Sequence, residues 1–155
     1  MIQVRELFRL LAHRAATTRS HGHQLYSKAQ LLSAEPFAKG VQLTLLLPPY
    51  SFNQTADGFI PRTVLCTILD AATSVSAWMA HPKQLVSMSA GMDFSFLRDV
   101  RSDEEILIQA TCVEVMGRVG HTLGEAKQGE NVIATMKHTV FYLDTTLKEA
   151  FKLAD

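Results

Sequence analysis

The chain has 155 residues, a length that fits one domain, and we expect residues 1–155 to form that single domain. Its fifteen basic residues are balanced by fifteen acidic ones, which argues against a nucleic-acid-binding protein that depends on bulk positive charge. Hydrophobic residues at 47% and charged residues at 19% are typical of a soluble protein with an ordinary core.

Residues 1–18 show the spacing of an amphipathic helix, with Val4, Phe8 and Leu11 on one stripe. We expect this helix to pack on the domain of a cytoplasmic protein. An Arg-rich start with few acids is also typical of a mitochondrial presequence, and that alternative stays open. His21 and His23 follow without a nearby thiol or carboxylate, so we interpret them as part of a polar turn.

Residues 24–37 and 39–47 are rich in strand-forming residues and are separated by a turn, so they predict a β-hairpin. Two prolines end the second strand, and a polar loop at residues 50–58 leads into a helix. Polar groups at a helix entrance lie beside free N–H groups, where a thioester carbonyl or a phosphate can be held.

Residues 58–80 predict one long helix that is entered through Pro61. Apolar side chains fill most of its circumference, which is typical of a buried helix. Arg62 and Asp70 interrupt the apolar run, so we interpret the segment as a core helix and not as a membrane span.

Asp70 is the acid of this helix that needs an explanation. Its helical neighbours are small, and three of the four carry a hydroxyl: Cys66, Thr67, Thr73 and Ser74. One interpretation is a helix-surface aspartate bonded to these hydroxyls. The other is a carboxylate that faces a cleft as a base or a nucleophile.

Four strands are predicted after the helix, at residues 84–98, 105–116, 119–127 and 131–142, and a short helix closes the chain at 147–153. In the first strand, residues alternate with a strict period of two: Met88, Ala90, Met92, Phe94 and Phe96 share a predicted core face, and Ser87 and Ser89 lie on the other. Hairpin spacing predicts an antiparallel sheet wrapped around one central helix, an α+β fold. The cysteines, Cys66 and Cys112, lack metal-ligand spacing and are expected to be buried thiols in a reducing compartment.

Four segments, in this order, resemble the hotdog-fold acyl-CoA thioesterases of the phenylacetate-pathway and thioesterase-superfamily-member type: ILDAATS, SAGMDFSFLRDVRSDE, VMGRVG and ENVIATMKHTVFY. The resemblance covers residues 41–142 and implies a hotdog fold, here with an N-terminal helix. It implies an enzyme of lipid metabolism that hydrolyses the thioester of acyl-coenzyme A, with no metal and no cofactor beyond the coenzyme A of the substrate. It also implies a homodimer with sites at the subunit interface, often assembled into a homotetramer.

The resemblance also implies roles for individual residues. Asp70 matches the helix carboxylate that acts as general base or nucleophile, and Ser89 matches a hydroxyl that places the water or the substrate. The implied coenzyme A contacts are Phe96, Leu97, Arg98, Arg101, Gly117, Arg118 and His138. Arginines suit phosphates, although a solvated turn residue is the alternative interpretation for each of them.

The chain departs from this family at the helix entrance, where relatives carry His-Gly-Gly and this chain has Pro61-Arg62-Thr63. The family's oxyanion hole uses the backbone N–H at the position of Arg62, which makes Arg62 a candidate catalytic residue. The family's loop asparagine falls near residues 53–55, and Asn53 is the candidate for this substrate-binding position. The changed entrance motivates an alternative function, a non-catalytic hotdog protein that binds acyl-CoA or a lipid. A hydratase or dehydratase of the same fold is a third and weaker hypothesis, because no histidine lies beside a helix acid at the helix entrance.

Overall fold

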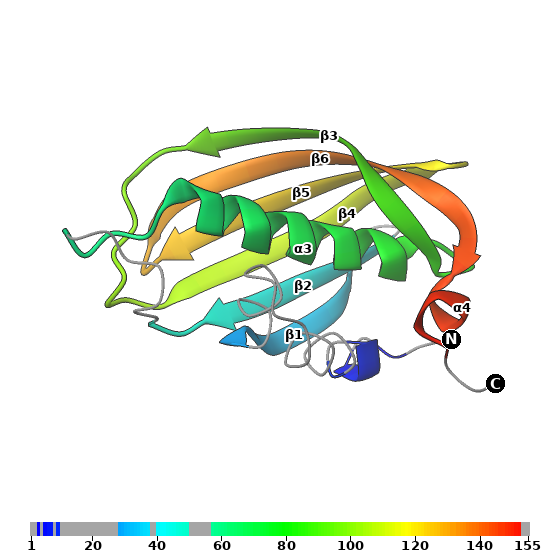
Figure 1. Ribbon diagram of the computed structural model, residues 1–155, viewed down its shortest axis with the longest axis horizontal. Coiled ribbons are helices and arrows are strands. Elements are labelled where there is room, and N and C mark those ends of the chain that lie inside the picture. Colours follow the sequence, from blue (N-terminus) through cyan, green and yellow to red (C-terminus); the bar gives the residue numbers. More distant parts are fainter. Residues whose placement is uncertain are drawn as a thin grey trace.

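The computed structural model describes Gln3, Arg9 and residues 5–7, 28–37, 40–49 and 57–152. Its elements follow in chain order: β1 (Gln30–Phe37), β2 (Gly40–Leu47), α3 (Arg62–Ala80), β3 (Leu85–Phe96), β4 (Ile106–Met116), β5 (Val119–Gln128), β6 (Asn131–Thr146) and α4 (Leu147–Phe151). The strands form one sheet in the order β1-β2-β4-β5-β6-β3, and neighbouring strands are antiparallel. The sheet curves around α3 (Figure 1), so the predicted sheet around one central helix is confirmed.

Helix α3 begins at Arg62, later than predicted, because the residues before it make other backbone contacts. The N–H of Ile60 donates to the carbonyl of Val100 at 2.8 Å, and the N–H of Ser102 donates to the carbonyl of Gly58 at 3.0 Å. Pro61 is the N-cap residue, and no side chain caps the helix there. The N–H of Val64 donates to the carbonyl of Pro61 at 2.9 Å, and the N–H groups of Arg62 and Thr63 precede the first residue that can bond within the helix.

The core lies between α3 and the sheet. Its fully buried large side chains on α3, β2, β4 and β6 are Leu65, Ile68, Leu69, Leu43, Leu45, Leu47, Ile106, Ile108, Ile133, Met136 and Tyr142. By length and a mean hydropathy of 1.3, α3 would qualify to cross a membrane, but 56% of that stretch is buried inside the protomer. The prediction of a core helix is in keeping with this packing.

Strand β5 lets α3 approach the sheet closely. A Cβ added at Gly124 would lie 3.0 Å from Leu69 Cδ2 and 3.0 Å from Thr73 Cγ2. Gly124 therefore lies directly under the helix. A larger side chain at Gly124 would push the helix away or displace both neighbours.

The predicted hairpin of β1 and β2 is confirmed by their antiparallel pairing, and β2 ends at Leu47, before the two prolines. Most of the predicted N-terminal helix, and both His21 and His23, lie outside the described residues. Within the described part of that segment, residues 5–7 and 9 are helical. Leu7 is fully buried in the core.

The strict alternation predicted for β3 is wrong at Ala90. Ser89 pairs with Val140 on β6, and Gly91 pairs with the next residue along β6, Thr139. Ala90 is therefore one residue too many for its partner strand, which is a β-bulge. A bulge of one residue exchanges the two faces of the strand from that point onward.

Because of this exchange of faces, side chains from both halves of β3 lie on the side of the sheet that faces α3. Before the bulge, Ser89 lies opposite a buried residue of β6 and faces α3; after the bulge, Phe94 and Phe96 do so. Met88, predicted on the core face, lies opposite Phe141 on the outer face and is exposed. One strand thus supplies a hydroxyl and two aromatic rings to the same side of the sheet.

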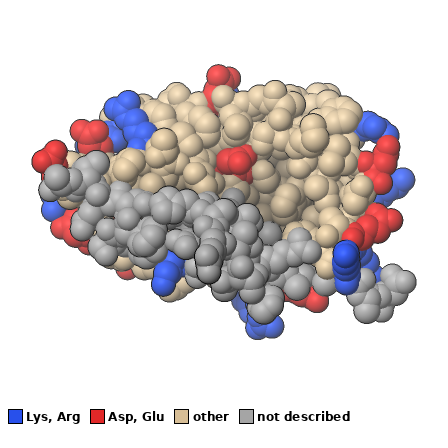
Figure 2. Space-filling model, viewed as in Figure 1, with Lys and Arg blue, Asp and Glu red and all other residues tan. Residues whose placement is uncertain are grey.

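Strand β3 is an edge strand, bonded to β6 on one side. Its middle, residues 88–93, is exposed on both faces, and Met92 there is 45% exposed. Figure 2 shows that charged side chains gather at the two ends of this view, whereas the area over α3 and β3 carries few of them. A long, weakly charged edge of this kind is a template for pairing with another strand.

Candidate active site

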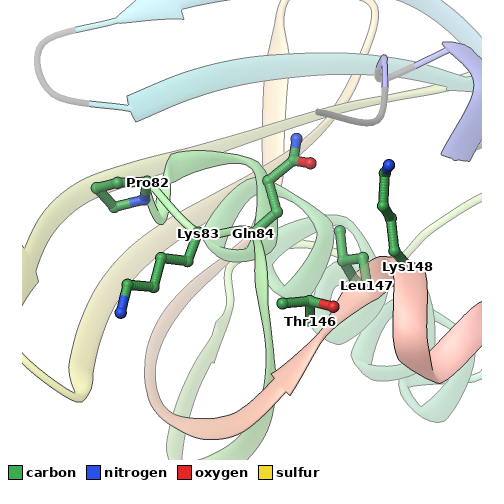
Figure 3. Close-up of a pocket in the computed structure, with 6 residues that line it drawn as sticks. All are labelled: Pro82, Lys83, Gln84, Thr146, Leu147 and Lys148. Atoms are coloured by element: carbon green, nitrogen blue, oxygen red, sulfur yellow. The ribbon is translucent and has the colours of Figure 1, made fainter. Parts of the chain in front are cut away.

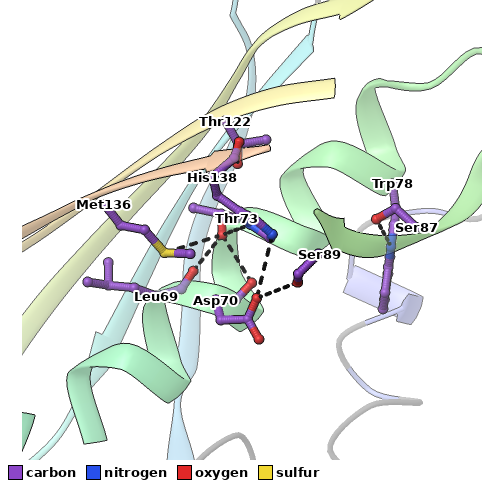
Figure 4. Close-up of polar contacts among 9 residues, drawn as sticks. All are labelled: Leu69, Asp70, Thr73, Trp78, Ser87, Ser89, Thr122, Met136 and His138. Atoms are coloured by element: carbon purple, nitrogen blue, oxygen red, sulfur yellow. Dashed lines mark hydrogen bonds and ion pairs between the residues drawn. The ribbon is translucent and has the colours of Figure 1, made fainter. Parts of the chain in front are cut away.

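Asp70 projects from the middle of α3, and its side chain is 41% exposed. The Ser89 hydroxyl donates a hydrogen bond to Asp70 Oδ1, with the two oxygens 3.2 Å apart (Figure 4). The bulge at Ala90 turns Ser89 toward the helix and makes this contact. The structure therefore brings together the two side chains to which the family resemblance gives catalytic roles.

His138 on β6 lies beneath the same carboxylate, and its side chain is 0% exposed. Its Nδ1 is 2.8 Å from Thr73 Oγ1, and its Nε2 is 3.8 Å from Asp70 Oδ1. Among the described residues Nε2 has no hydrogen-bond partner. Burial lowers the pKa of His138, while the nearby Asp70 charge raises it in part, so the ring is neutral at pH 7.

The two oxygens of Asp70 have different surroundings. Oδ1 faces Ser89 and His138, whereas Oδ2 points away from both residues (Figure 4). A carboxylate held by one oxygen and open at the other can accept a proton from a bound water or attack an acyl carbon.

The start of α3 is the second chemical feature. The Arg62 guanidinium lies over the ring of Phe96, 5.2 Å from its centroid, and that ring stacks with Phe94 at 6.1 Å. The side chain of Arg62 is thus directed toward the end of β3. Its backbone N–H belongs to the first helical residue, for which a helix has no internal acceptor.

The thioesterase superfamily model matches residues 58–135, half of the chain. The chain belongs to the thioesterase superfamily. A search of curated protein sequences found no match. Membership rests on the segment that holds α3, β3, β4 and β5 and most of the residues discussed above.

Solved thioesterase structures show the same fold. Zebrafish thioesterase superfamily member 2 superimposes with a TM-score of 0.78 at 15% identity, covering 92% of this chain and 100% of that one. Thioesterase superfamily member 2 from Mus musculus superimposes with a TM-score of 0.69 at 17% identity, covering 91% of this chain and 98% of that one. A hypothetical thioesterase from Streptococcus pneumoniae, solved with coenzyme A, superimposes with a TM-score of 0.70 at 12% identity, covering 87% of this chain and 96% of that one. The predicted hotdog fold is thereby confirmed.

Four residues predicted to contact coenzyme A lie together in and after the end of β3: Phe96, Leu97, Arg98 and Arg101. Leu97 and Arg98 are exposed. Arg101 donates to both carboxylate oxygens of Asp103, at 3.0 and 2.8 Å, and lies 3.4 Å from Glu104. Arg98 makes no ion pair with any described residue, so a phosphate would meet less competition there.

Gly117 and Arg118 form the turn between β4 and β5, at the other end of the sheet. Gly117 has φ of 58°, a conformation that suits glycine. Arg118 pairs with Asp144 and lies over the ring of Phe141, 5.9 Å from its centroid. In the strand register, the Phe141 row is seven residues from the row that holds Phe96, which is roughly 23 Å. One protomer therefore keeps these two groups of predicted contacts apart.

The remaining predictions have different outcomes. Asn53 lies outside the described residues. His138 is enclosed by protein, and its buried position favours a role through Asp70 over a direct contact with coenzyme A. The family resemblance implied no role for Thr73, whose hydroxyl contacts His138. The sequence feature that could have pointed to Thr73 is its position one turn after Asp70 on the helix.

The cavity in Figure 3 lies beyond the C-terminal end of α3, next to α4, and has a volume of about 240 Å³. It is lined by Pro82, Lys83, Gln84, Thr146, Leu147 and Lys148. None of these residues belongs to the candidate site. Within the described ranges, no group of three or more His, Cys, Asp or Glu is placed to hold a metal ion.

Proposed function

We propose that this protein is an acyl-CoA thioesterase that hydrolyses the thioester of acyl-coenzyme A to a free acid and coenzyme A. The observation that carries the proposal is the half-exposed Asp70 carboxylate in the middle of a buried helix, held at Oδ1 by Ser89. Membership of the thioesterase superfamily, and a neighbour solved with coenzyme A, support this chemistry.

In the proposed reaction, Asp70 Oδ2 takes a proton from a water whose oxygen attacks the thioester carbon. The carbonyl oxygen becomes an oxyanion, which the N–H of Arg62 stabilises. When the intermediate collapses, the C–S bond breaks and the coenzyme A thiolate leaves and takes up a proton. Direct attack by Asp70 is the alternative route. A single turnover in ¹⁸O-labelled water detects direct attack when water opens the resulting anhydride at Asp70 Cγ, because that step places the label in Asp70 itself.

We infer that this reaction uses two copies of the chain. Arg62 and Asp70 are eight residues apart on one straight helix, roughly 12 Å along its axis, so one thioester carbon cannot touch both. We therefore propose that each site combines Asp70 of one subunit with the Arg62 N–H of the partner subunit. A homodimer would follow from this interface, and a tetramer built from two dimers would need a second one.

The free edge of β3 supports this dimer. Its residues 88–93 are exposed and weakly charged, and the edge faces away from β6. Antiparallel pairing of two β3 strands would extend the sheet across a two-fold axis. A two-fold axis that crosses β3 between Ser89 and Phe96 would bring Asp70 of one subunit toward the start of α3 in the partner subunit.

Mixing two inactive variants tests the shared site. Asp70→Asn removes the base, and Arg62→Pro removes the N–H, which proline lacks. A hybrid dimer retains one intact site, so random mixing after unfolding and refolding should restore about a quarter of wild-type activity. Light scattering gives the oligomeric state of each sample. Two inactive variants that form dimers yet recover no activity on mixing would contradict the shared site.

The hydrolase itself is tested with a thiol-release assay over short, medium, long and aromatic acyl-CoAs. We expect Asp70→Asn to lower kcat by ~10²-fold or more with an unchanged fold. The matched control is Glu114→Gln, an exposed carboxylate on β4 away from the candidate site and from the free edge of β3. Tight binding of acyl-CoA without thiol release by the wild type would instead establish the binding protein, and an active Asp70→Asn would exclude Asp70 as the base.

A further inference from the structure

The imidazole of His138 is a polar group on an otherwise apolar part of its face of β6. Its neighbours on that face, Met136 and Val140, are buried and apolar. A buried ring nitrogen without a hydrogen bond costs free energy, and such groups are rare in folded proteins. His138 Nε2 is in this state among the described residues. An apolar residue would fill the same space without that cost, so the histidine calls for an explanation.

Among the residues that the structure describes, the charged group that this nitrogen faces is Asp70. Nε2 is 3.8 Å from Oδ1 of Asp70, the same oxygen that accepts the hydrogen bond from Ser89 at 3.2 Å. Figure 4 shows His138 and Ser89 approaching this oxygen from β6 and β3. Catalytic hydrogen bonds are often long before the substrate binds, and a small rotation of the carboxylate would bring Nε2 within hydrogen-bond reach.

The position of the imidazole proton follows from the surroundings. Thr73 Oγ1 has one hydrogen and four acceptors nearby: the Leu69 carbonyl at 2.8 Å, the Asp70 carbonyl at 3.0 Å, His138 Nδ1 at 2.8 Å and the weaker acceptor Met136 Sδ at 3.9 Å. If Nδ1 carried the ring proton, the Nε2 lone pair would face a carboxylate, which is repulsive. If Thr73 donates to Nδ1, the proton resides on Nε2 and points at Asp70. The second arrangement is electrostatically favoured.

We propose that Thr73 and His138 form a buried relay that fixes Asp70, with Thr73 donating to Nδ1 and Nε2–H directed at Oδ1. His138 is then a positioning residue, which together with Ser89 holds Oδ1 and leaves Oδ2 as the reacting oxygen. This inference deepens the proposed thioesterase function and rests on it for its catalytic part. The tautomer of His138 is a physical claim independent of any substrate.

The first test measures the tautomer. ¹⁵N NMR of the imidazole nitrogens in the wild-type protein at pH 7.5 should show a neutral His138 with its proton on Nε2. Thr73→Val removes the donor to Nδ1 and should change the balance between the two tautomers. The matched control is Thr67→Val, which loses a similar hydrogen bond to a helix carbonyl, at 2.9 Å from Thr63, without touching His138. A wild-type proton on Nδ1 would overturn the relay.

The second test measures turnover. His138→Leu should lower kcat by ~10-fold or more and leave KM within about two-fold, because Asp70 would lose its orientation while the substrate-binding surface stays intact. His138→Gln places an amide donor near the former Nε2 and should recover much of the loss. Thr73→Val should lower kcat in the same way, and Thr73→Ser, which keeps the hydroxyl, should recover it.

The outcomes separate this inference from the function on which it rests. A wild type that hydrolyses no acyl-CoA, or an active Asp70→Asn, would contradict the proposed function, whatever the NMR result. An inactive Asp70→Asn combined with wild-type kcat in a folded His138→Leu would overturn the relay alone. Should His138→Leu fail to fold, Thr73→Val carries the same test, since it is nearly isosteric. Equal kcat in Thr73→Val and Thr67→Val would then overturn the relay.

Discussion

Ser89 donates its hydroxyl hydrogen to Oδ1 of Asp70 at 3.2 Å, across the gap between β3 and α3. Ser87, two residues earlier, lies on the same face and accepts instead from Nε1 of Trp78 at 2.9 Å. The chain thus offers two neighbouring serines, of which one contacts the carboxylate and the other contacts the tryptophan.

These serines form a matched pair of variants. Ser89→Ala should lower kcat roughly 10-fold, since it removes a hydrogen bond to a charged group. Ser87→Ala should act mainly on stability, through the loss of the bond to Trp78. Steady-state kinetics and thermal unfolding of both variants check this assignment. A larger loss of kcat in Ser87→Ala than in Ser89→Ala would reverse it.

Arg62→Pro isolates the backbone N–H at the start of α3. Pro61 has φ of −57° and ψ of 141°, the extended conformation that a following proline requires, so the substitution fits the backbone. We expect kcat to fall ~10²-fold relative to Arg62→Ala, which loses the same guanidinium but keeps the N–H. Circular dichroism checks that both variants fold. Equal kcat in the two would show that this N–H stabilises no oxyanion.

Deleting Ala90 should remove the bulge from β3 and exchange the faces of one half of the strand. Either Ser89 turns away from Asp70, or Phe94 and Phe96 turn away from the core. Both outcomes cost stability or activity, whereas Ala90→Ser keeps the residue count and should retain both. Thermal unfolding and thiol release are the measurements. A deletion variant as stable and active as wild type would mean that the bulge has no such role.

Gly124→Ala should destabilise the protein by about 1–3 kcal/mol, because its new Cβ would meet Leu69 and Thr73 at 3.0 Å. Gly91→Ala is the control, since a Cβ there has nothing within 4 Å. Urea unfolding gives both free energies. A Gly124→Ala variant no less stable than Gly91→Ala would indicate that α3 yields easily at this point.

Stability should fall as the pH drops below about 6.5, in part because of His138. Burial lowers its pKa in the folded state from the ordinary value of 6.5, so the unfolded chain takes up the proton first. The folded state is therefore favoured above this pH and loses that advantage as the solution becomes more acidic. The difference in unfolding temperature between pH 7.5 and pH 5.5 should shrink in His138→Leu.

The control for this titration is His81. Burial and Lys83 also lower the pKa of His81, and its contribution remains in the His138→Leu variant. Asp70 on α3 is the charged group that faces His138 and opposes the effect of burial. An identical pH dependence in wild type and His138→Leu would show that His138 does not titrate differently in the two states.

Local patterns predicted much of this molecule, and long-range geometry accounts for what they missed. The apolar circumference of α3 and the hairpin spacing of the later strands predict the sheet around a helix, and Asp70 stands out among small neighbours. The bulge at Ala90 leaves no mark in an alternating pattern, so Met88 was placed on the wrong face. The contact between Thr73 and His138 joins two segments through the fold, and no spacing within either segment indicates it.

A ribosome completes α3 before it has made β3, β4, β5 or β6, four of the strands that cover this helix. During that interval the apolar surface of α3 can be covered only by segments made before it, among them Leu7, β1 and β2. Shielding becomes complete when synthesis reaches the end of β6. The order of elements along the chain thus leaves much of the apolar surface of α3 uncovered during synthesis, and transiently exposed surface of this kind favours aggregation.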